Sequence, residues 1–83
     1  MQLSQLRITI NSPEAVLFEG EAVSVTSENT IGTFDILPNH TNFISIISNS
    51  LTLVRQNKKT ENFSFASGVI QCKNNVVTVY VGV

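Results

Sequence analysis

The chain has 83 residues and a formal net charge of −1, from five Lys/Arg and six Asp/Glu. This length leaves room for one small domain, residues 1–83, because two independent units would each be too short to support a hydrophobic core. Hydrophobic residues make up 42% and charged residues 13%, which excludes a disordered or coiled-coil chain. The lack of excess positive charge argues against nucleic acid as a partner.

Alternating apolar and polar residues predict β-strands from the start of the chain. Leu6, Ile8 and Ile10 alternate with polar residues and predict a first strand. Residues 15–18 predict a second strand, which enters a tight turn at residues 19–21. The next predicted strands span residues 23–26 and 32–36, with a polar loop between them.

The second half of the chain continues the same pattern after a turn at Pro38-Asn39. Its predicted strands span residues 43–47, 51–53, 63–65, 70–72 and 77–81. Residues 43–47 are apolar enough to be buried on both faces, and we expect turns at residues 48–50 and 67–68 and a hairpin turn at Asn74-Asn75. No segment has helical spacing, so about eight or nine short strands predict an all-β antiparallel sandwich or barrel.

Titratable and metal-binding residues are too sparse for a recognisable catalytic or metal site. Cys72 is the single cysteine and alternates with Ile70, which predicts a buried side chain and a reducing compartment. Asp35, His40 and a nearby serine are the residue types of a catalytic triad, but no nucleophile motif accompanies them. We therefore expect no enzyme activity, cofactor or metal, and we predict neither a signal peptide nor a membrane span.

The segment 37–43 is the remaining candidate for function. Pro38 fixes its own φ angle, Asn39 tolerates a turn, and His40 is left between two apolar strands. A plain connection and a binding loop explain this pattern equally well.

Several short motifs carry a resemblance to a known family, in its order and spacing. They are Ser12-Pro13-Glu14, Phe18-Glu19-Gly20, Gly32-Thr33-Phe34, Ile36-Leu37-Pro38-Asn39-His40 and Phe65-Ala66-Ser67-Gly68. Over about residues 6–81 the chain resembles the N-terminal domain of the epsilon subunit of F-type ATP synthase. The resemblance implies a β-sandwich of about ten short strands in two sheets, in a non-catalytic part of the central stalk.

The resemblance also implies partners and contact residues. It implies a peripheral subunit at the cytoplasmic face of the energy-transducing membrane, which attaches the gamma subunit to the c ring and touches the membrane only through the complex. It assigns the c-ring contact to Gly32 and Thr33, and the gamma contact to residues on the other loop: Pro38, Asn39, His40, Thr41 and Phe43. The family usually has glycine where this chain has Asn39, which implies a positive φ angle there.

Two further expectations concern the chain's length and an alternative function. Family members continue into a C-terminal helical hairpin, so the resemblance implies a short form without that hairpin and without its inhibitory role. The alternative is a free-standing β-sandwich module that binds glycan or peptide. Such a module needs convergent exposed aromatics, whereas the five Phe stand mostly at positions predicted to face inward and Tyr80 faces outward.

Overall fold

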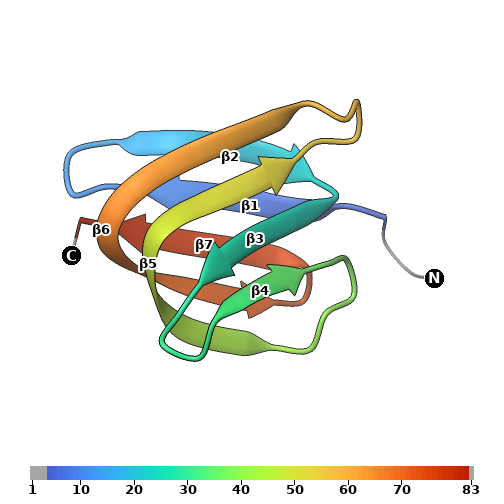
Figure 1. Ribbon diagram of the computed structural model, residues 1–83. Helices are drawn as coiled ribbons and strands as arrows, with labels where there is room; N and C mark the ends of the chain where they lie inside the picture. Colours follow the sequence, from blue (N-terminus) through green and yellow to red (C-terminus); the bar gives the residue numbers. More distant parts are fainter. Residues whose placement is uncertain (1–3, 83) are drawn as a thin grey trace.

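The computed structural model describes residues 4–82 and contains seven β-strands (Figure 1). The strands are β1 (Leu6–Asn11), β2 (Val16–Ala22), β3 (Ser24–Glu28), β4 (Thr33–Ile36), β5 (Phe43–Val54), β6 (Thr60–Lys73) and β7 (Val76–Val81). The predicted all-β class is confirmed. Within residues 4–82 there is no helix that could span a membrane.

The seven strands form one continuous sheet in the order β2-β1-β7-β6-β5-β3-β4. Every neighbouring pair is antiparallel except β1 and β7, which run parallel. Figure 1 shows that the two longest strands, β5 and β6, curve from one layer of the sandwich into the other. Because each of them contributes to both layers, the count is seven strands in one bent sheet rather than about ten in two.

The bend replaces two of the predicted turns. At residues 48–50 the strand continues through a β-bulge, where Ser48 pairs with Ser67 but Asn49 pairs with Phe65. Asn49 has a φ angle of 73°, in the left-handed region that Asn tolerates better than most residues. A bulge increases local twist and bends the strand, so these residues mark a change of layer rather than a chain reversal.

The tight turn predicted at residues 19–21 is also wrong. Strand β2 passes straight through this segment, and Gly20 pairs with Ile8 of β1. The chain changes layer slightly later, where the Val23 amide donates a hydrogen bond of 2.7 Å to the Val54 carbonyl. Gly20 therefore occupies a position inside a strand and does not mark a chain reversal.

The core lies between the layers and consists of the inward residues of every strand. The buried hydrophobic residues are Leu6, Ile8, Ile10, Ala22, Val25, Ile36, Ile47, Leu51, Leu53, Ile70, Cys72, Val77, Val79 and Val81, and all five Phe pack against them partly buried. The predicted burial of Ile70 and Cys72 is confirmed. The expectation that residues 43–47 are buried on both faces is wrong, because Ile44 and Ile46 are 68% and 73% exposed on the outside of β5.

Candidate functional site

The loop of residues 37–42 joins β4 to β5 and begins with the predicted turn. The His40 amide donates a hydrogen bond of 3.1 Å to the Leu37 carbonyl, which closes a four-residue turn with Pro38 and Asn39 in its centre. Asn39 has a φ angle of 68°. Proline followed by a residue with positive φ is the pattern of a type II turn, so the positive φ implied for Asn39 is confirmed.

The His40 side chain is held in place from two sides. Its Nδ1 atom lies 2.7 Å from the Thr41 carbonyl oxygen. Because a carbonyl only accepts, Nδ1 must donate in this bond, which leaves Nε2 of the neutral ring as an acceptor. The imidazole also meets the Phe43 ring edge-on at 5.9 Å between centroids, and Phe43 packs in turn against Phe34 at 5.2 Å. The ring is therefore positioned by an aromatic residue that belongs partly to the core.

The loop is also bonded to the hairpin turn between β6 and β7. The Asn39 amide donates to Asn75 Oδ1 at 2.5 Å, and Asn75 Nδ2 donates to Asn39 Oδ1 at 3.3 Å. The Asn74 amide donates to Asn42 Oδ1 at 3.3 Å. The sequence predicts a turn at Asn74 and Asn75 but indicates no part for them in the site. The loop 37–42 and the β6–β7 turn meet because β5 pairs with β6 in a register that places Phe43 opposite Cys72.

The second predicted contact region, Gly32 and Thr33, lies at the other end of β4. Asn29 Oδ1 accepts hydrogen bonds from the amides of Ile31 (2.9 Å) and Gly32 (3.2 Å), which shapes the tip of the β3–β4 hairpin. Ile31 is 94% exposed at this tip, a feature that the sequence analysis missed. Figure 1 shows this hairpin and the loop 37–42 at the two ends of the short strand β4, so the two predicted contacts lie on separate loops.

The residue types of a triad are not brought together. Asp35 accepts a hydrogen bond of 2.5 Å from Thr26 on the neighbouring strand, whereas the bond of His40 goes to Thr41. Across residues 4–82, no group of three or more His, Cys, Asp or Glu side chains is arranged to hold a metal ion. Burial raises the pKa of the Cys72 thiol, so this group keeps its proton more strongly than an exposed cysteine.

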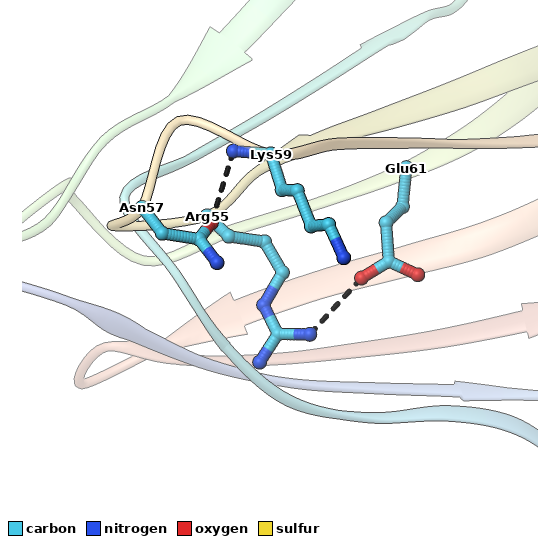
Figure 2. Close-up of polar contacts among 4 residues, drawn as sticks. All are labelled: Arg55, Asn57, Lys59 and Glu61. Carbon is cyan, nitrogen blue, oxygen red and sulfur yellow. Dashed lines mark hydrogen bonds and ion pairs between the residues drawn. The ribbon is translucent and has the colours of Figure 1, made fainter.

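A polar cavity of about 450 Å³ lies between the β5–β6 hairpin and strands β1 and β2. Its lining consists of Gln5, Arg7, Gly20, Glu21, Arg55, Gln56 and Asn57. Figure 2 shows how the hairpin is held: Arg55 Nη1 donates to Glu61 Oε2 at 3.0 Å, and the Lys59 amide donates to Asn57 Oδ1 at 2.9 Å. The Arg55 guanidinium also lies 5.4 Å from the centroid of the Phe18 ring. The two hydrogen bonds lie within the hairpin, and the contact with Phe18 fastens the hairpin to β2.

An exposed apolar surface begins where the loop 37–42 ends. Ile44 and Ile46 face outward on β5, and the strand register continues the row of Ile46 through Val69 to Tyr80. The predicted outward direction of Tyr80 is confirmed by its 51% exposure. A hollow of about 260 Å³ lies beside the loop, lined by Asn42, Phe43, Ile44, Gln71, Cys72 and Lys73. An ordered polar loop therefore borders an apolar sheet face, a combination typical of protein interfaces.

Comparison with known families gives a match over almost the whole chain. The family model described as the ATP synthase delta/epsilon chain β-sandwich domain matches residues 5–83. The ATP synthase epsilon chain of Leptospira borgpetersenii is 32% identical over 75 residues, covering 90% of this chain and 59% of the relative. That of Bordetella petrii is 35% identical over 78 residues, covering 93% and 55%. The chain thus spans a little more than half the length of these curated relatives.

Solved structures with the same fold come from mitochondrial ATP synthases. A chain in the Euglena gracilis OSCP/F1/c-ring structure superposes with a TM-score of 0.91 at 13% identity, over 98% of this chain and 52% of that one. A chain in the Tetrahymena thermophila central stalk/c-ring structure gives a TM-score of 0.75 at 11% identity, over 98% and 66%. At this level of identity, these likenesses establish the fold.

Proposed function

The chain belongs to the ATP synthase delta/epsilon β-sandwich domain family, and from this membership we propose that it is a non-catalytic rotor component of an F-type ATP synthase. In this role it attaches the gamma subunit to the c ring, so that ion translocation is coupled to ATP synthesis or hydrolysis elsewhere in the complex. The observation that carries the proposal is the family match across residues 5–83. We place the chain at the cytoplasmic face of the membrane, as a peripheral subunit held there by its partners.

We assign the gamma contact to the loop 37–42 and the start of β5. The assigned residues are Pro38, Asn39, His40, Thr41 and Phe43. The ordered turn supports this assignment, because a loop that is already fixed loses little conformational entropy on binding. The imidazole supplies a hydrogen-bonding tip, and Ile44 and Ile46 supply exposed apolar area on the strand that follows the loop.

We assign the c-ring contact to the β3–β4 hairpin, with Gly32 and Thr33 at its tip. The exposed Ile31 supports an apolar component in this contact. The position of the hairpin supports the coupling role, because contacts on two separate loops, one at each end of β4, allow one subunit to connect two partners (Figure 1).

Affinity capture of the tagged chain from solubilised membranes of the source organism tests this proposal. We expect gamma and c subunits to be retained and identified by mass spectrometry. His40→Ala should reduce gamma recovery about tenfold, the effect of losing a moderate interface hot spot, and leave the thermal midpoint within about 2 °C. Glu14→Ala is the matched control, because Glu14 is an exposed loop residue outside both assigned contacts.

The result that contradicts the proposal is equally specific. Recovery of the chain alone, or with glycan or peptide ligands in place of rotor subunits, would favour the binding-module alternative. A large loss of thermal stability in His40→Ala would instead show that His40 supports the fold rather than a contact.

A further inference from the structure

The β6–β7 turn holds the loop 37–42 from outside, although 36 residues separate Asn39 from Asn75. The side-chain amide of Asn75 both accepts from the Asn39 backbone and donates to the Asn39 side chain. Such a two-way bond restricts the orientation of Asn39 as well as its position, because it engages both ends of the Asn75 side-chain amide and both the backbone and the side chain of Asn39. Asn39 is the residue with positive φ that immediately precedes His40.

The turn that carries Asn75 is itself fixed. Asn74 and Asn75 both have positive φ angles, of 52° and 65°, as in the two-residue turns that match the twist of a hairpin. The Arg7 amide donates a hydrogen bond of 2.9 Å to the Asn75 carbonyl, which ties the turn to β1 as well as to β6 and β7. Asn75 is therefore a fixed point to which a less regular segment is attached.

We infer that Asn75 is a positioning residue, which holds the loop 37–42 in the conformation that presents His40 to its partner. The inference rests on the proposed function for the identity of that partner, the gamma subunit. The claim that Asn75 fixes the conformation of the loop concerns this chain alone. The left-handed conformation costs some free energy even for asparagine, and an outside contact offsets that cost in addition to the turn within the loop. The amide of Asn75 provides that contact, and a preformed loop binds more tightly than one that must become ordered.

The neighbouring residue offers a matched control. Asn74 has the same residue type, the same turn and the same sign of φ, but it bonds the loop through its backbone amide rather than its side chain. Asn74→Gly and Asn75→Gly both preserve the turn, since glycine adopts positive φ without strain. Only Asn75→Gly removes the side-chain bonds to Asn39. Asn75→Asp is the rescue variant, because it keeps an oxygen that accepts from the Asn39 amide.

The test measures two properties of these variants. The first is amide hydrogen exchange in the isolated chain, comparing Asn39 with the core-strand residue Ile70. We expect Asn75→Gly to accelerate exchange at Asn39 at least about fivefold without changing Ile70, and Asn74→Gly and Asn75→Asp to have smaller effects. The second is capture of the gamma subunit, which we expect Asn75→Gly to weaken roughly three- to tenfold, because the two lost bonds act on binding only through the conformation of the loop.

Each outcome separates the inference from the proposed function. Unchanged exchange at Asn39 in Asn75→Gly, or equal acceleration in Asn74→Gly, overturns the positioning role without any reference to a partner. Weaker capture with His40→Ala but not with Asn75→Gly also overturns it. If exchange at Asn39 responds as expected but neither His40→Ala nor Asn75→Gly weakens capture of gamma, the assignment of the gamma contact to this loop is wrong. The attachment of the loop by Asn75 then still stands.

Discussion

Gly68 lies where β6 bends, and we expect its replacement by alanine to be the most damaging single-methyl change in this chain. A Cβ atom at Gly68 would lie 2.5 Å from the Tyr80 carbonyl oxygen and 3.2 Å from Val81 Cγ1. Ordinary contact begins at 3.4 Å, so the β7 backbone must retreat by about 0.9 Å, the difference between 3.4 and 2.5 Å. Gly68 pairs with Val81 in the sheet, which means that this retreat pulls directly on the β6–β7 ladder.

The expected loss combines three contributions. Overpacking of a tight site costs about 1–3 kcal/mol, and each weakened backbone hydrogen bond adds about 0.5–1.5 kcal/mol. Alanine offsets about 0.4–1 kcal/mol of this loss, because it lowers the conformational entropy of the unfolded chain relative to glycine. We therefore expect Gly68→Ala to lower the free energy of unfolding by about 2–3 kcal/mol, which for a domain of this size corresponds to a fall in Tm of roughly 10–20 °C.

Gly20→Ala is the control for this experiment, because Gly20 also lies inside a strand. Its Cβ would approach the tip of the Phe18 ring at 3.2 Å and Arg55 Nη2 at 3.7 Å, and both are ends of side chains that can move. We expect a change of less than about 1 kcal/mol, in either direction. Urea unfolding followed by circular dichroism measures both variants. If Gly20→Ala destabilises the chain as much as Gly68→Ala, the contact with the Tyr80 backbone is not the reason for glycine at position 68.

Three further predictions concern the loop, the thiol and the β5–β6 hairpin. Phe43→Ala should lower the free energy of unfolding by about 2–3 kcal/mol in urea, less than a fully buried Phe, because Phe43 is partly exposed but packs against Phe34 and His40. Cys72 should resist alkylation in the native state and react only on unfolding. Burial raises the pKa of this thiol above 9.0, so its contribution to stability is complete below pH 9.0 and falls as the pH rises further. A pH series of urea midpoints measures this fall. Lys58→Gly should raise the free energy of unfolding by about 0.5–1 kcal/mol, measured by thermal unfolding, because Lys58 has a φ angle of 68°.

The sequence predicted which residues face the core wherever burial follows from local alternation. Leu6, Ile8 and Ile10 are inward for the same reason as Val77 and Val79: side chains alternate across a strand, and only one face is covered. The all-β class, a sandwich or a barrel, follows from that alternation together with the turn signals and needs no knowledge of which strands pair. The choice of a sandwich came from the family resemblance.

The connections between strands could not be predicted in the same way. Glycine at position 20 and the Ser-Asn-Ser segment at 48–50 carry the chemistry of turns, yet both lie within continuous strands. Whether such residues reverse a chain or bend it depends on whether both sides keep pairing with the same neighbouring strand. Strand β6 accompanies β5 through the bend, so the pair curves together. That partnership is a property of the assembled sheet and not of the local residues.

The candidate site combines both kinds of information. The Pro38-Asn39 turn was predictable because its chemistry is local. The part played by Asn75 depends on the β5–β6 register that pairs Phe43 with Cys72 and on the β6–β7 register that pairs Cys72 with Val77. A slip of one residue in β6 would turn Cys72 toward solvent and move Asn75 away from Asn39 together. The packing that buries the core therefore also brings the turn to the loop, which is why a loop of exposed polar residues can be held rigidly by a small domain.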